Sequence, residues 1–149
     1  MGDAVGRATI EDLVAITGEQ REFWGERDMS HLHHPMLVHE FGQTSVVIRS
    51  EDGPIVAYLF GFVTLDGRIG YAHLVAVRSS HRRLGLGRSL YENFEALARE
   101  RDAVALKAYT RPENTQSISF HRSIGMSVSE VADYSGPGEN RVVFRRELA

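Results

Sequence analysis

The chain has 149 residues, contains no cysteine and carries a formal net charge of −3 at pH 7. This length suits one domain over residues 1–149. The lack of cysteine excludes disulfides, thiolate nucleophiles and cysteine-bound metals. The negative charge excludes a broad basic field for nucleic acid. No apolar run of about 18 residues occurs and the N-terminus lacks a signal-peptide pattern, so a cytoplasmic protein without a membrane segment is expected.

The first third of the chain predicts a short strand and several helices. The strand is expected at Arg7–Thr9, and Thr9 also caps a helix, with Asp12 at the capping-box distance. The apolar side of this helix consists of Leu13, Val14 and Ile16. Residues 18–43 predict a helix at about 19–27, then a loop and a short helix near 36–41.

The remaining chain alternates strands and helices. Strands at 44–49, 55–63 and 70–77 form an antiparallel meander. The clearest helix runs from Gly85 to about Arg101, with Leu86, Leu90, Phe94 and Leu97 on one face. A strand at 104–109, a helix at 115–124 and strands at 127–134 and 141–148 follow. The order predicts an α/β fold (an α+β mixed sheet) with about seven strands and four helices.

A glycine-containing segment, Arg82-Arg83-Leu84-Gly85-Leu86-Gly87, lies between the apolar strand Leu74–Val77 and the clearest helix. Glycines let backbone N–H groups approach an anion, and a helix start adds unpaired N–H donors and a positive dipole end. Arg82, Arg83 and Arg88 add positive charge. The segment predicts a loop that holds a cofactor pyrophosphate, although two glycines also fit a plain strand-to-helix turn. The spacing matches neither a P-loop nor the dinucleotide GxGxxG motif.

Two motifs carry a family resemblance. Arg82-x-x-Gly85-x-Gly87, after a strand and opening a helix, resembles the acetyl-CoA signature of the GNAT N-acetyltransferase superfamily. Asn114-x-x-Ser117-x-x-Phe120-His121-x-x-x-Gly125-Met126 is similar to its later motif, N-x-x-(A/S)-x-x-F-Y-x-x-x-G-F. The element order agrees too, so the resemblance covers nearly the whole chain. It implies a GNAT-like acyl-CoA N-acyltransferase fold with acetyl-CoA as co-substrate.

The resemblance assigns the cofactor contacts. The strand Leu74–Val77 is implied to pair with the pantetheine arm, and a backbone N–H near Val77 to bond the acetyl carbonyl. Backbone N–H groups from Arg83 to Arg88 are implied to hold the pyrophosphate. Asn114 is implied to contact the pantetheine, although it can equally cap a helix. The implied cofactor-binding residues are Leu74, Val75, Ala76, Val77, Arg82, Arg83, Leu84, Gly85, Leu86, Gly87, Arg88, Asn114, Phe120 and His121.

Candidates for catalytic proton transfer are His121, Tyr71 and His73, with Glu40 and His39 as further candidates for the base. His121 stands where the family often has tyrosine, whose hydroxyl can protonate the leaving thiolate. An imidazolium, with its free pKa of about 6.5, can do the same; His121→Phe is then expected to lower kcat more than it raises the KM for acetyl-CoA. A histidine that packs or only contacts the cofactor is the alternative. Tyr71 and His73 alternate outward on their strand and can relay the amine proton through water.

Residues 18–43 occupy the place where this superfamily usually builds its acceptor site. Acidic and aromatic residues there, among them Trp24 and Glu40, suit a cationic amine through charge and cation–π contact. A solvated helix face with a buried Trp24 fits equally well. The Asp133-Tyr134 segment closes the other side or serves a dimer contact.

A histidine cluster, His31-x-His33-His34, invites a zinc interpretation. No cysteine or carboxylate accompanies it in the immediate run, so a surface loop without a metal is favoured.

The leading hypothesis is an N-acetyltransferase that moves an acetyl group from acetyl-CoA to a primary amine, carried by a small molecule or a peptide. Direct attack in a ternary complex is favoured because no cysteine can carry the acetyl group. The alternatives are a non-catalytic CoA- or ligand-sensing module of the same fold and a small nucleotide-binding protein. No nucleic-acid or membrane partner is expected, and a homodimer is compatible with the resemblance.

Overall fold

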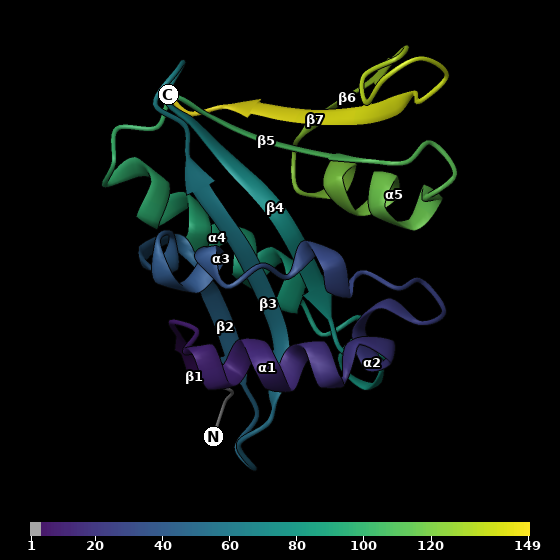
Figure 1. Ribbon diagram of the computed structural model, residues 1–149. Coiled ribbons are helices and arrows are strands. Elements are labelled where there is room, and N and C mark those ends of the chain that lie inside the picture. The colour runs from purple at the N-terminus through teal and green to yellow at the C-terminus, as the bar shows by residue number, and fades with distance from the viewer. Residues whose placement is uncertain (1–3) are drawn as a thin grey trace. The chain divides into compact units, whose positions relative to one another are not determined.

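The computed structural model describes residues 4–149, in which seven strands are hydrogen-bonded in the order β1-β2-β3-β4-β5-β7-β6 (Figure 1). The strands are β1 (Ala4–Gly6), β2 (Val46–Arg49), β3 (Ile55–Val63), β4 (Ile69–Val77), β5 (Ala105–Thr110), β6 (Ser127–Val131) and β7 (Arg141–Glu147). The α-helices are α1 (Ile10–Gly18), α2 (Gln20–Trp24), α3 (Met36–His39), α4 (Leu86–Arg99) and α5 (Thr115–Ser123). Short 3₁₀ helices are η1 (Ser30–Leu32), η2 (Gly42–Thr44) and η3 (Ser79–His81). The mixed α/β class with seven strands is confirmed for residues 4–149, which contain five α-helices where about four were expected.

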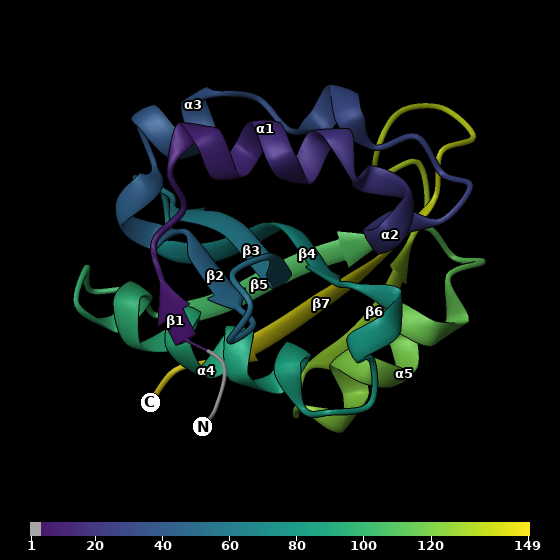
Figure 2. The same cartoon turned by 90° about the horizontal axis from the view of Figure 1, so that it is seen from below.

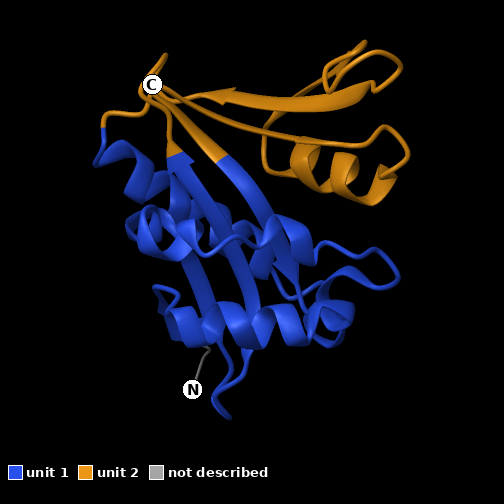
Figure 3. Cartoon of the chain, in the orientation of Figure 1, with its two compact units in different colours: residues 1–62, 72–101 blue, residues 63–71, 102–149 orange. Residues whose placement is uncertain are grey.

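The chain divides into two compact units, which Figure 3 colours separately. Unit 1 comprises Met1–Phe62 and Ala72–Arg101, and unit 2 comprises Val63–Tyr71 and Asp102–Ala149. The glycine-containing segment therefore belongs to unit 1, and the second motif belongs to unit 2. No helix in residues 4–149 has the length and apolarity needed to cross a membrane.

Unit 1 is a sheet covered by helices on both faces. In Figure 2, α1 and α3 lie along one face of β2 and β3, and α4 lies along the other. This two-sided cover explains why Ile55–Phe60 is buried at every position rather than at alternate ones. The core on the α1 side includes Ile16, Leu37, Tyr58 and Leu74.

The start of α1 is fixed by its cap. The Thr9 hydroxyl accepts a hydrogen bond from the Asp12 N–H, and the Asp12 carboxylate accepts from the Thr9 N–H, so the expected capping box is confirmed. The strand expected at Arg7–Thr9 is wrong: β1 ends at Gly6, because the extended backbone of Thr9 belongs to the cap. Val14 is 67% exposed, so it does not belong to the apolar side of α1.

Helix α4 begins one residue after Gly85 and is buried along Leu90, Tyr91, Phe94 and Ala98. The expected face was correct at Leu90 and Phe94, whereas Leu97 is only half-buried.

Unit 2 joins the start of β4 to the C-terminal strands. Ile69–Tyr71 pairs in parallel with Ala105–Lys107, and β7 pairs antiparallel with both β5 and β6. Helix α5 packs on β6, and Gly125 ends the helical segment at φ 88°. β6 ends at Val131 rather than near 134, because turns occupy the residues that follow.

Candidate active site

The segment Arg82–Gly87 contains two residues with a left-handed backbone conformation before α4 begins. Arg83 has φ 65° and Gly85 has φ 78°, a conformation that costs a non-glycine residue about 1–2 kcal/mol. Gly85 is the N-cap of α4 and provides no side-chain cap, so no side chain of this residue occupies the N–H donors of the first turn. An uncapped helix start of this kind is a suitable anion site when the ligand itself supplies the acceptor oxygens.

The strand that leads into this loop alternates as the sequence predicted. Leu74 and Ala76 are buried, while His73, Val75 and Val77 are half-buried on the opposite side. The pairing of β4 with β5 covers Ile69–Tyr71, so Leu74–Val77 lies beyond it.

Arg82 uses its side chain within the protein. Its Nη2 donates to the Phe23 carbonyl over 3.1 Å, and its Nε reaches the Val77 carbonyl at 3.4 Å. Its guanidinium is therefore directed to α2, whereas the sequence indicated it as added positive charge for an anion. Arg82 and the neighbouring Arg83 and Arg88 are all exposed.

His73 and Tyr71 differ in their surroundings although they are two residues apart. Burial lowers the pKa of His73, and a backbone hydrogen bond with Leu32 opposes that shift. Burial and the neighbouring Tyr109 raise the pKa of Tyr71 far above its usual range. His73 is thus a neutral imidazole near pH 7, and Tyr71 remains a phenol.

Tyr71 belongs to a tyrosine cluster in unit 2. The Tyr71 and Tyr109 ring centroids are 6.3 Å apart, and those of Tyr109 and Tyr134 are 5.2 Å apart. Lys107 Nζ lies 5.5 Å from the Tyr134 ring centroid. The sequence indicated only the Asp133-Tyr134 segment and not this grouping, because the three tyrosines meet through two strands and a turn that are distant in the sequence.

His121 is buried and stacked on Phe144, with ring centroids 3.9 Å apart and planes inclined by 1°. Its Nδ1–H donates to the Ser117 carbonyl over 2.7 Å. Burial lowers the pKa of His121 to about 4 despite that hydrogen bond. The ring is therefore neutral at pH 7, and this geometry fits a packed histidine better than the imidazolium acid considered from the sequence.

Asn114 is the N-cap of α5. Its Oδ1 accepts from the Ser117 N–H over 3.2 Å, and its Nδ2 donates to the Thr110 hydroxyl over 3.1 Å. Both ends of the amide thus have partners within unit 2. Phe120, from the same helix, lies edge-on to His121 with centroids 5.1 Å apart.

Asn114→Ala is expected to lower the free energy of unfolding by about 1 kcal/mol, the usual contribution of an N-cap side chain. Asn114→Asp, which keeps an acceptor oxygen for the Ser117 N–H, is expected to stay close to wild type. Urea unfolding measures both values. Equal losses in the two variants would contradict the cap as the main role of the residue.

The histidine cluster is divided by its environment. His31 and His34 are exposed, but His33 is only 6% exposed, so the interpretation of the whole cluster as a surface loop is wrong at His33. Its Nδ1–H donates to the Met29 carbonyl over 2.7 Å, and its Nε2 lies 2.7 Å from the Tyr58 hydroxyl. Within residues 4–149, no three His, Asp or Glu side chains are grouped closely enough to hold a metal ion.

Tyr58 is the residue that sequence reasoning missed here. Its hydroxyl accepts from Trp24 Nε1–H over 2.7 Å and, because His33 Nδ1 carries the ring proton, it donates to His33 Nε2. The chain Trp24–Tyr58–His33–Met29 fixes the neutral tautomer of His33, and burial further lowers the pKa of that histidine. A tyrosine inside the apolar strand Ile55–Val63 was the available signal, since a buried hydroxyl requires a partner.

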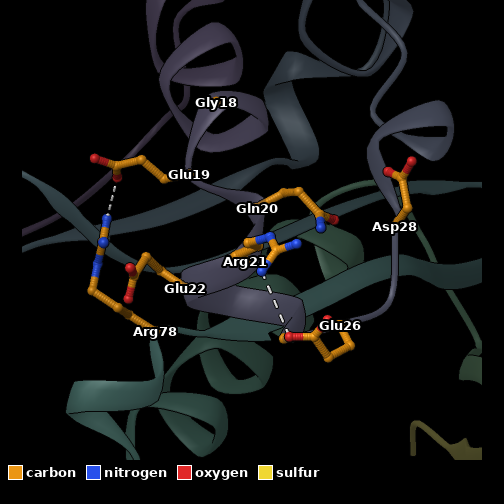
Figure 4. A pocket seen from close by; sticks show the side chains of 9 residues that line it. Gly18, Glu19, Gln20, Arg21, Glu22, Glu26, Asp28 and Arg78 are labelled. Carbon is orange, nitrogen blue, oxygen red and sulfur yellow. Dashed lines mark hydrogen bonds and ion pairs between the residues drawn. The ribbon is translucent and has the colours of Figure 1, made fainter.

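A hollow of about 630 Å³ lies beside α2 and is lined by acidic side chains (Figure 4). Four acidic residues of the segment 18–43 line it, namely Glu19, Glu22, Glu26 and Asp28, together with Arg21 and Arg78. The arginines pair with Glu26 and Glu19, at 3.6 Å and 2.6 Å. Trp24 and Glu40 do not line this hollow; Trp24 is half-buried and bonded to Tyr58, and Glu40 is exposed after α3.

Comparison with known proteins identifies the family. The model of the acetyltransferase (GNAT) family matches residues 10–126. The chain belongs to this family. The resemblance, the fold class, the enzyme class and acetyl-CoA as the family's donor, all expected from the two motifs, are thereby confirmed.

Individual relatives of this GNAT protein agree with the assignment. The catalytic subunit naa20 of the N-terminal acetyltransferase B complex from Schizosaccharomyces pombe is 28% identical over 90 residues, 58% of this chain and 50% of the relative, so the match spans half of the relative's length. Naa20 from Chaetomium thermophilum, solved with a bisubstrate analogue, has a TM-score of 0.76 and 24% identity over 97% of this chain and 86% of its own. Salmonella typhimurium yncA, solved with its cofactor acetyl-CoA, has a TM-score of 0.75 and 20% identity over 100% of this chain and 95% of its own.

Proposed function

We propose that this GNAT protein transfers the acetyl group of acetyl-CoA to a primary amine by direct attack in a ternary complex. The observation that carries the proposal is the loop Arg82–Gly87, which follows an apolar strand and delivers an uncapped helix start at Gly85. This arrangement fits a pyrophosphate, because unpaired backbone N–H donors and the positive end of the helix dipole lie together at the N-terminus of α4 and both stabilise an anion.

Each cofactor contact is proposed for a residue of this chain. Backbone N–H groups from Arg83 to Arg88 bind the pyrophosphate. The backbone of Leu74–Val77 pairs with the pantetheine arm, and an N–H near Val77 stabilises charge that develops on the acetyl oxygen. Asn114, Phe120 and His121, which the resemblance also implied as contacts, lie in unit 2, and their role towards the cofactor stays a prediction. Acetyl-CoA, when bound, supplies an activated thioester.

His73, rather than Tyr71, is proposed as the base that accepts the proton of the attacking amine. A neutral imidazole can accept a proton directly or through one water, and the lowered pKa of His73 keeps it neutral near pH 7. The strongly raised pKa of Tyr71 makes the phenolate too scarce to act as a base. His121 is proposed to pack α5 against Phe144 rather than to transfer a proton.

The acceptor is proposed to be an amine of a small molecule or a peptide that meets Trp24 and Glu40. N-terminal peptides are the first class to test, since the curated relative is named as an N-terminal acetyltransferase subunit. A single catalytic domain over 1–149, a cytoplasmic location and a homodimer remain predictions. So does the absence of a nucleic-acid partner.

The test is an acetyl-acceptor screen with purified protein, in which N-terminal peptides, polyamines, amino acids and antibiotic amines are compared. Turnover with intersecting initial-rate lines is expected, because both substrates must be bound together before the amine attacks. Parallel lines would overturn direct attack. CoA binding without turnover of any amine would favour the sensing module.

A further inference from the structure

Helix α2 is fastened to the end of β4 by Arg78. The guanidinium of Arg78 donates to the Ile55 carbonyl from both Nε and Nη2, at 3.0 Å and 2.8 Å. It also pairs with Glu19 at 2.6 Å (Figure 4). The guanidinium carbon lies 4.8 Å from the Phe23 ring centroid. The Arg78 side chain is only 14% exposed. Its guanidinium therefore contacts α2, the residue before it, and β3.

Arg82 makes the second link, from the loop itself. Its hydrogen bond to the Phe23 carbonyl joins the first residue of the pyrophosphate loop to the last turn of α2. The Gly25 N–H bonds to the Arg21 carbonyl, so the Phe23 carbonyl lies in the turn that ends this five-residue helix. A planar guanidinium that donates to a backbone carbonyl fixes position as well as distance.

The contact continues from α2 into the core of unit 1. The Phe23 ring lies edge-on to Tyr58 with centroids 4.9 Å apart, and the adjacent Trp24 donates to the Tyr58 hydroxyl. The sequence has one tryptophan. Trp24 is thus a single optical probe placed one residue from the carbonyl that Arg82 holds.

We propose that Arg82 is a positioning residue that couples the pyrophosphate loop to α2. Through this link it holds Trp24, within the segment 18–43 where the acceptor site is expected, in place when the cofactor binds. The inference rests on the proposed function, since it takes the loop at 82–87 as the cofactor site. It assigns Arg82 to α2 and leaves phosphate binding to the backbone N–H groups and to the exposed Arg83.

The test follows Trp24 fluorescence during titration with CoA, while calorimetry measures CoA affinity separately. Wild type is expected to show a saturable change in Trp24 emission. Arg82→Gln is expected to lose that change although its Kd for CoA shifts by less than about threefold, and Arg82→Lys to restore only part of it because an ammonium lacks the planar fork. Arg83→Gln, the adjacent exposed arginine, is the matched control, with the emission change kept and CoA affinity lowered.

The outcomes separate the two claims. CoA binding to wild type and an emission change that survives in Arg82→Gln would overturn the coupling and leave the proposed function standing. CoA binding with no emission change in wild type would do the same. Failure of wild type to bind CoA would overturn the proposed function, and the coupling with it. Acrylamide quenching of Trp24 without ligand, expected to increase in Arg82→Gln but not in Arg83→Gln, checks the link directly.

Discussion

Gly85→Asp is expected to raise the KM for acetyl-CoA by about 10- to 100-fold while leaving the fold intact. Gly85 has φ 78°, and a Cβ built there meets no atom within 4 Å; aspartate is among the few residues that tolerate this conformation. A carboxylate about 6 Å from a phosphate charge costs about 1.4–2.8 kcal/mol at effective dielectric constants of about 40 to 20. Each 1.4 kcal/mol is tenfold in affinity.

Gly85→Asn is the matched control for that experiment. Asparagine has the same shape as aspartate and the same tolerance of left-handed backbone, but no charge. Its KM for acetyl-CoA is expected to stay within a few-fold of wild type, with both variants compared by steady-state kinetics and by thermal unfolding. Equal increases in KM for the two variants would contradict the proposal that this loop binds the pyrophosphate.

Lowering the pH from 7 to 5 is expected to reduce the free energy of unfolding by about 2 kcal/mol through His121. Burial lowers the pKa of this histidine to about 4 in the folded state, against 6.5 for a free histidine side chain. Below pH 6.5 the unfolded chain therefore binds the proton that the folded chain excludes, so stability falls as the pH falls towards 4. His33 and His73, whose pKa values are also lowered, contribute in the same direction.

Urea unfolding at pH 7, 6 and 5 measures this dependence. His121→Phe is expected to flatten it while losing about 1 kcal/mol at pH 7, because phenylalanine keeps the stack on Phe144 but removes the donor to the Ser117 carbonyl. His39→Gln, at an exposed position, serves as the control and is expected to keep the wild-type slope. An unchanged slope in His121→Phe would mean that another group carries the pH dependence.

Local patterns accounted for the elements that depend on neighbours in the chain. The capping box at Thr9 and Asp12 was predictable because its hydrogen bonds join residues three positions apart. The strand at Ile55–Val63 was predicted with its observed bounds, since turns flank an apolar run. The alternation of β4 was also readable, because strand geometry places successive side chains on opposite faces.

The roles of charged and polar side chains were less accessible. Arg82 belongs to a glycine loop in the sequence, but its partner, the Phe23 carbonyl, is 59 positions away. His33 lies in a histidine cluster, yet its Nε2 bonds to the hydroxyl of Tyr58, 25 positions away, and burial lowers its pKa. Tyr71, Tyr109 and Tyr134 become neighbours only through sheet register and a loop.

By itself, the sequence determined the family and the donor, because the glycine loop and the Asn114–Met126 segment use backbone conformation and local spacing that a short stretch of chain encodes. Tertiary structure alone decided which polar side chains are buried and which partners they contact. Burial turned His121 and His33 into neutral, hydrogen-bonded rings, and packing against α2 committed Arg78 and Arg82 to holding a helix. The protonation state and the hydrogen-bond partners of a side chain depend on desolvation and on long-range contacts, which only the folded chain establishes.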